Sequence, residues 1–195
     1  DIFIRIKKGF FVFDIESNPD ENHDFLYGFL SADNIKFRHE DCKYQPILNL
    51  TNKDNEKFNS NIFEKIYSKE NWPILHYGET EKINLIKLAK INNFSSEDIE
   101  KLKSRFIDLH LIIRESWILP IKNYSLKSVA NYIGFKWKQK NVSGSRALFW
   151  WIQFKNTNEN SFLDKIITYN KDDCFATLEI AKWYVNNADK FLNKN

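Results

Sequence analysis

A short apolar run near the start of the chain, residues 10–13, leads directly into two carboxylates, Asp14 and Glu16. A continuous run of Phe and Val, bounded by Gly9 and a turn at Pro19, is typical of a strand that is buried on both faces at the centre of a sheet. Side chains two apart on a strand share a face. The pattern therefore predicts that Asp14 and Glu16 project side by side from the end of a central strand.

Further apolar runs predict the rest of a sheet. Residues 25–30 and 35–38 are predicted as two more strands, which would form an antiparallel meander with the first. Residues 72–77 are predicted as a fourth strand. Pro73 is compatible with it, because it would lie at the start of the strand, where a missing backbone N–H does least harm. We expect three antiparallel strands followed by at least one more.

Helical spacing of apolar residues follows in the segments 58–66, 83–88 and 162–180. Two other helices are predicted from their ends. Ser95 and Asp98 have the spacing of a capping box, and the pair Ser125 and Gly134 would start and stop a helix through residue 133. The chain is therefore predicted to fold as an α/β domain.

The chain has 195 residues, enough for one well-filled α/β domain and short for two, and its 17 Phe, 8 Tyr and 6 Trp supply core material. Because the sequence contains no Met, we interpret it as a piece of a larger protein. Residues 1–9 are expected to be a linker or an edge strand from a missing upstream region, and residues 10–195 the domain itself. Cys42 and Cys174 have no metal-ligand spacing, and no signal peptide or long apolar span is present, which favours a cytoplasmic protein without a membrane role.

Two like charges at the end of a buried strand would repel each other and would be poorly solvated. Carboxylate pairs supply the oxygen ligands that Mg²⁺ or Mn²⁺ prefers, so Asp14 and Glu16 are candidate metal ligands. A solvent-facing acidic strand end would produce the same motif. From these two residues alone, both interpretations remain open.

Two later segments add candidates of the same chemistry. Glu81 would lie in the first turn of a helix that follows the fourth strand, where a carboxylate interacts favourably with the helix dipole. An ordinary acidic first turn is the alternative there. Tyr169 and Asp173 are four residues apart on the last predicted helix, so they share one otherwise apolar face. An acid and a phenol on such a face require a partner.

The net charge of the chain is only +3, but the positive charge is concentrated in one segment. Residues 122–146 contain no acidic residue and six basic ones: Lys122, Lys127, Lys136, Lys138, Lys140 and Arg146. Tyr124, Tyr132, Phe135 and Trp137 are interleaved with them. Lysines and aromatic rings together suit phosphate contacts and base stacking in a single-stranded nucleic-acid channel. A solvated surface would look similar.

The order of these motifs resembles a known family. Asp-x-Glu on a central strand, an acid opening a helix, and Tyr-x-x-x-Asp on a late helix are similar to the tyrosine-type DEDD 3′→5′ exonucleases of the ribonuclease H-like superfamily. More closely, the stretches FVFDIES, PILHYGETE, FIDLHLIIRE, YSLKSVANYIGF and YNKDDCFATLEI resemble the ribonuclease H-like domain of predicted RecB-family nucleases. The resemblance extends over about residues 10–185.

The resemblance implies a ribonuclease H-like fold, in which helices flank a central mixed sheet made of the antiparallel meander and parallel strands. It implies two Mg²⁺ or Mn²⁺ ions, which in such sites lie roughly 3.5–4 Å apart. The implied ligands are Asp14, Glu16, Glu81 and Asp173, with Tyr169 as a further catalytic residue; Glu81 replaces the usual Asp. His76, Asp108 and Lys127 lie in matching segments and would have supporting roles or contact the substrate. The basic segment itself supplies the expected nucleic-acid contacts: Lys127, Lys136, Trp137, Lys138, Lys140 and Arg146.

We therefore expect a metal-dependent 3′→5′ exonuclease that acts on single-stranded or frayed DNA, with RNA left open, within a larger nuclease chain. The alternative is a catalytically weak domain that binds nucleic acid or a partner and positions a separate upstream nuclease. A ribonuclease H-like endonuclease fits less well, because ribonuclease H takes its Glu from a helix, whereas Glu16 follows Asp14 on the first strand.

Overall fold

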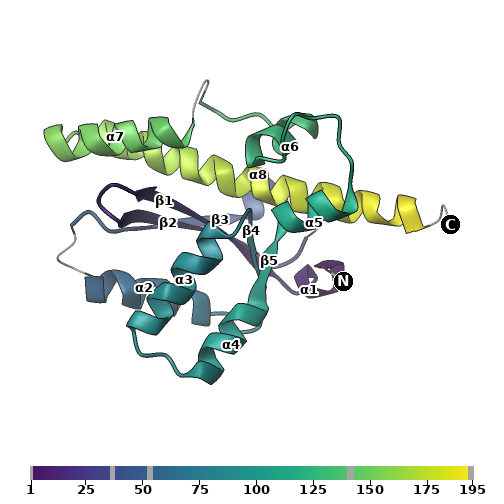
Figure 1. The fold of residues 1–195 in the computed structure, drawn as a ribbon, viewed down its shortest axis with the longest axis horizontal. Coiled ribbons are helices and arrows are strands. Elements are labelled where there is room, and N and C mark those ends of the chain that lie inside the picture. The colour runs from purple at the N-terminus through teal and green to yellow at the C-terminus, as the bar shows by residue number, and fades with distance from the viewer. Residues whose placement is uncertain (1, 36–37, 52–54, 140–142, 193–195) are drawn as a thin grey trace.

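One mixed sheet of five strands, in the order β3-β2-β1-β4-β5, forms the centre of the computed structural model, which describes residues 2–35, 38–51, 55–139 and 143–192 (Figure 1). The strands are β1 (Phe10–Asn18), β2 (His23–Ala32), β3 (Lys43–Leu48), β4 (Ile74–His76) and β5 (Phe106–Asp108). The first three pair antiparallel, and β4 and β5 continue the sheet from β1 in parallel. The predicted mixed sheet, with its antiparallel meander and parallel strands, is confirmed.

Helices cover both faces of this sheet (Figure 1). They are α1 (Ile2–Ile6), η1 (His39–Asp41), α2 (Asn55–Tyr67), α3 (Thr80–Ile91), α4 (Ser96–Arg105), α5 (Leu109–Ser116), α6 (Leu126–Tyr132), α7 (Gly144–Thr157) and α8 (Asn160–Leu192). Phe11 and Phe13 of β1 pack with α2, α3 and α4 on one face, whereas Phe10 and Val12 pack with α5, α6 and α8 on the other. Because side chains alternate along a strand, Asp14 and Glu16 belong to the face that α8 covers.

Two predicted strands differ from the structure. The third strand of the meander is β3, Lys43–Leu48, and not residues 35–38, of which 36 and 37 lie outside the described residues. The strand β3 lies at the sheet edge, where Pro46 and half-exposed polar residues are tolerated and weaken the apolar pattern. Residues 2–6 form the helix α1, so they are not an edge strand. A segment of five residues with Ile at every second position is too short to distinguish the helix period of 3.6 residues from the strand period of two.

The predicted helix starts are confirmed at Ser95 and Ser125, whose side chains accept hydrogen bonds from the N–H groups of Asp98 (3.1 Å) and Ser128 (3.3 Å). The helix α7 was not predicted. It packs on α8 and against the sheet, where Trp151 stacks on Phe25 of β2 with ring centroids 4.2 Å apart. Within the described ranges, no helix combines the length and the apolar character that crossing a membrane requires.

Candidate metal centre

The strand β1 and the helix α8 bring three carboxylates together. Asp14, Glu16 and Asp173 each offer one oxygen atom, and these atoms lie within 4.8 Å of one another. Asp14 and Glu16 share the face of β1 over which α8 crosses, and Asp173 projects from α8 toward that face. The structure therefore places three of the four predicted ligands in one group.

Burial makes this group costly in the charged form. Glu16 and Asp173 are each only 7% exposed. Burial, followed by the charge of Asp173, raises the pKa of both Asp14 and Glu16 well above their usual range. Burial also raises the pKa of Asp173 to about 6, although hydrogen bonds from Trp137 and Tyr169 partly offset it. A divalent cation would relieve this repulsion, and a set of donors made only of carboxylate oxygens fits Mg²⁺ or Mn²⁺.

Glu81, the fourth predicted ligand, lies beside the group but outside it. It is in the first turn of α3 and is 8% exposed, and its Oε2 atom has no hydrogen-bond partner among the described residues. Burial raises the pKa of Glu81 to about 7, and the charges of Asp108 and Asp173 add to the shift. The carboxylate therefore interacts with the metal centre electrostatically, without joining the three clustered oxygens.

Tyr169 lies where its spacing from Asp173 predicted. It is 5% exposed and makes a side-chain hydrogen bond to Asp173. Burial and the neighbouring charges of Asp173 and Glu16 raise the pKa of the phenol far above its usual value, so the hydroxyl stays protonated and donates. The Nζ atom of Lys127 lies 5.0 Å from the centroid of the Tyr169 ring. A protonated phenol and a cation thus border the three carboxylates.

Asn170 belongs to the site, and the sequence analysis missed it. Its fully buried Nδ2 atom donates to Asp14 Oδ2 (2.7 Å) and to Glu16 Oε1 (3.4 Å), while the hydroxyl of Tyr44 donates to its Oδ1 atom (2.8 Å). A Cβ atom at Gly28 would lie 1.7 Å from that Oδ1. A glycine inside an otherwise apolar strand indicates that another group approaches the strand backbone closely. Gly28 is therefore the sequence feature that could have pointed to a buried polar side chain at this place.

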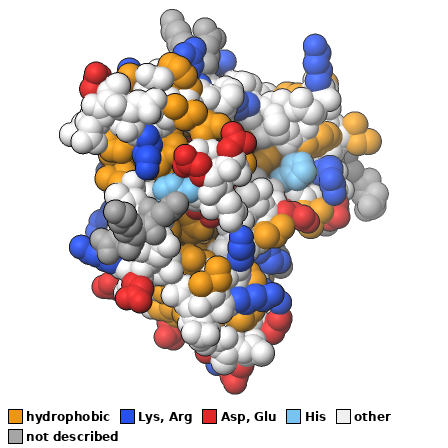
Figure 2. Space-filling view, turned by 60° about the vertical axis from the view of Figure 1, so that its left-hand side comes forward, with side chains coloured by type: hydrophobic (Ala, Val, Ile, Leu, Met, Phe, Trp, Pro, Cys, Tyr) orange, Lys and Arg blue, Asp and Glu red, His pale blue; other side chains and the backbone are white. Residues whose placement is uncertain are grey.

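The predicted nucleic-acid residues are spread over the structure. Trp137 Nε1 donates to Asp173 Oδ1 (2.6 Å), and the Lys138 backbone N–H donates to Asp172 Oδ2 (2.8 Å), so this segment is fastened to α8. Lys127 lies beside Trp137, Lys136 is exposed, Arg146 is exposed on α7, and Lys140 lies outside the described residues. Figure 2 shows one face on which Lys and Arg side chains (blue) are scattered among hydrophobic ones (orange) and do not form a single basic patch.

His76 and Asp108 hold the turn that leads into α3. His76 Nδ1 donates to the Gly78 carbonyl, and Asp108 Oδ1 accepts from the N–H groups of Gly78 (3.0 Å) and His110 (2.9 Å). Burial lowers the pKa of His76 and favours its neutral form. These contacts connect the ends of β4 and β5 to the helix start that carries Glu81.

Without divalent ions, we expect the free energy of unfolding to fall as pH rises from about 4 to 7. The pKa of Asp173 rises from 3.8 to about 6 on folding and that of Glu81 from 4.5 to about 7. Between these values the folded state binds more protons than the unfolded state, so stability declines with pH, on the order of a few kcal/mol in total. Urea denaturation in chelator measures this decline.

Glu81→Gln should flatten this decline, whereas the neighbouring exposed Glu79→Gln is the matched control and should not. A free energy of unfolding that is constant or rises over this range would contradict the assignment of buried, mutually repelling carboxylates.

Asn170→Asp is expected to destabilise the protein in chelator by about 3 kcal/mol or more. The change replaces the donor to Asp14 and Glu16 by a further buried negative charge and leaves neighbouring carboxylates unpaired. Asn131→Asp, at an exposed position of α6, is the control. Equal urea midpoints for the two variants would remove Asn170 from the support of the site.

A comparison with protein-family models matches residues 11–185 to the RNase H superfamily. No curated protein and no solved structure matches the chain. The match covers the sheet, the carboxylates of β1 and the segment of α8 that carries Asp173. The chain therefore belongs to the RNase H superfamily.

Proposed function

We propose that this domain is a metal-dependent 3′→5′ exonuclease that hydrolyses single-stranded or frayed DNA, with RNA as a second substrate to be tested. The observation that carries the proposal is the group of three carboxylates, half-buried Asp14 with buried Glu16 and Asp173, whose oxygen atoms lie within 4.8 Å of one another. Membership of the RNase H superfamily supports a nuclease. The domain would act within a larger nuclease chain.

Asp14, Glu16 and Asp173 would hold two Mg²⁺ or Mn²⁺ ions, and Glu81 would assist from the margin of the site. Bound divalent ions supply charge neutralisation at the scissile phosphate and a nucleophile at neutral pH. Asn170 keeps the two β1 carboxylates in fixed orientations, because both donors of its amide are aimed at them. The chain would thus present acceptor oxygens without rearrangement.

Tyr169 would orient the attacking water and would not act as a free base. Its hydroxyl is protonated at neutral pH and is hydrogen-bonded to Asp173, so it can hold a group beside that carboxylate but cannot remove a proton from it. Lys127, next to the Tyr169 ring, would contact a phosphate. Lys136, Trp137, Lys138, Lys140 and Arg146 remain proposed contacts to the strand.

The decisive experiment incubates the domain with single strands of DNA and RNA labelled at the 3′ or the 5′ end, in Mg²⁺, Mn²⁺ or chelator. A 3′→5′ exonuclease releases the 3′ label first as a mononucleotide and shortens the 5′-labelled strand stepwise. Products of internal cleavage, or early release of a 5′ label, would contradict the proposed polarity. Cleavage that persists in chelator would contradict the metal requirement.

The second candidate function is a catalytically weak domain that binds nucleic acid or a partner and positions a separate nuclease. The position of Glu81 outside the group of clustered oxygens favours this alternative. Strand binding without any cleavage in either metal would select it.

A further inference from the structure

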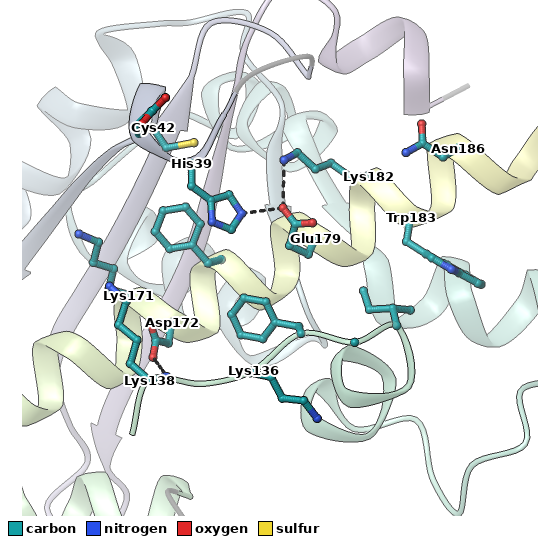
Figure 3. A pocket seen from close by; sticks show the side chains of 15 residues that line it. His39, Cys42, Lys136, Lys138, Lys171, Asp172, Glu179, Lys182, Trp183 and Asn186 are labelled. Carbon is teal, nitrogen blue, oxygen red and sulfur yellow. Dashed lines mark hydrogen bonds and ion pairs between the residues drawn. The ribbon is translucent and has the colours of Figure 1, made fainter. Parts of the chain in front are cut away.

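A groove runs along the outer face of α8, between η1, the segment 133–138 and residues 171–186 of the helix (Figure 3). This α8 groove has a volume of about 840 Å³. Fifteen helical steps, from 171 to 186, correspond to about 22 Å at 1.5 Å per residue. The groove is therefore long enough for several units of an extended chain.

Aromatic rings form part of its lining. Phe135 lines the groove with a half-buried ring, and buried Phe175 lies beneath the His39 ring, with the two ring centroids 4.6 Å apart. Trp183 lines the end of the groove away from Lys138 and Lys171 (Figure 3). Flat rings of this kind bind nucleobases by stacking, and they do so without sequence preference.

The acids of the groove already have partners. Glu179 Oε1 is 2.7 Å from His39 Nε2 and 3.0 Å from Lys182 Nζ. Glu40 Oε1 is 2.7 Å from Arg38 Nη1, and Asp172 accepts from the Lys138 N–H. Among the described residues, no carboxylate lies within 4.0 Å of the amino groups of Lys136, Lys138 or Lys171. The charge of Asp172 offsets part of the charge of Lys138 and Lys171, so the three lysines together leave a net positive charge for an anionic ligand.

The lysine-rich end of the groove lies next to the metal centre. Figure 3 shows Lys138 and Lys171 beside Asp172, which precedes Asp173 on α8. The wall there is the segment 135–138, whose Trp137 side chain donates to Asp173 and whose Lys138 N–H donates to Asp172. A strand that leaves the metal centre over this wall would meet the lysines first and the aromatic rings next.

We propose that the α8 groove binds single-stranded nucleic acid on the 5′ side of the scissile phosphate, with phosphates at Lys136, Lys138 and Lys171 and a base against the half-buried ring of Phe135. This proposal rests on the proposed function, because a 3′→5′ exonuclease must hold the remaining strand on that side. Aromatic rings next to lysines favour a nucleic acid over an acidic peptide, which would use the charges but not the flat rings.

The first test measures binding of fluorescein-labelled dT12 and U12 by anisotropy, in chelator and at several salt concentrations. The groove variant carries Lys136→Gln, Lys138→Gln and Lys171→Gln. The control carries Lys57→Gln, Lys87→Gln and Lys90→Gln on exposed positions of α2 and α3, with the same change in net charge. The groove variant should bind at least tenfold more weakly, and its log–log salt slope should fall by about 2, or 0.7 per lost phosphate contact. Equal behaviour of the two variants would overturn the proposal.

The second test isolates base stacking with an abasic strand of the same length. The unmodified protein should bind it about tenfold more weakly than dT12, and Phe135→Leu should remove most of that difference. Equal binding of the abasic strand and dT12, or equally strong competition by a peptide of twelve Glu residues, would overturn recognition of a nucleic acid. Because these measurements are made in chelator, their outcome is independent of whether the protein cleaves a strand when metal is present.

Discussion

Asp14→Asn is expected to remove the stabilisation of this protein by divalent ions while leaving the metal-free fold unchanged or more stable. In the unmodified protein, saturation at one hundred times the dissociation constant adds about 2.7 kcal/mol. For a domain of this size that amounts to roughly 5–10 °C in melting temperature. Without metal, Asp14 is a half-buried carboxylate repelled by Asp173 and Glu16, so its neutral replacement removes repulsion.

Thermal unfolding with millimolar Mn²⁺ and with chelator measures both effects. Asp164→Asn, at an exposed position of the same helix as Asp173, is the charge-matched control and should keep the full metal shift. A melting temperature of the unmodified protein that Mn²⁺ leaves unmoved would argue against a preformed metal centre. So would a shift that survives in Asp14→Asn.

Tyr169→Phe is expected to lower the single-turnover cleavage rate by about 10²- to 10⁴-fold, the usual cost of losing a positioned acid–base or orienting group. The change keeps the ring in its buried position and removes only the hydroxyl that is bonded to Asp173. The melting temperature and its rise with Mn²⁺ should therefore survive. In contrast, Asp173→Asn should damage metal binding as well as cleavage.

Tyr184→Phe is the control for loss of a phenol, because Tyr184 lies nearer the C-terminal end of the same helix, away from the carboxylates. The assay uses a 3′-labelled strand and saturating Mn²⁺, so that a weakened metal affinity does not enter the rate. If Tyr169→Phe digests this strand as fast as Tyr184→Phe, the phenol packs the core and takes no part in the reaction.

Local sequence pattern was sufficient for the elements that carry the carboxylates. The run of Phe and Val before Asp14 predicted a central strand, and the period of two then placed Asp14 and Glu16 on one face. The four-residue spacing of Tyr169 and Asp173 placed both on one face of a helix. These predictions hold because strand and helix periods depend on neighbours within a few residues.

Edges and ends were harder to predict. The edge strand β3 has one open side, so its half-exposed residues follow no strict alternation, and α1 is too short for its period to be recognised. The helix α7 was not predicted, because its buried Trp151 and Phe154 pack against Phe25 of β2, which is distant in the sequence.

What the tertiary structure alone decided is how residues about 155 positions apart meet. The crossing of α8 over β1 brings Asp173 to Asp14 and Glu16, and it aims the Asn170 amide at both strand carboxylates through the space that Gly28 leaves open. The same crossing turns the opposite face of α8 outward and forms the α8 groove with η1 and the segment 133–138. Such contacts depend on the packing of whole elements, which no local period of the sequence encodes.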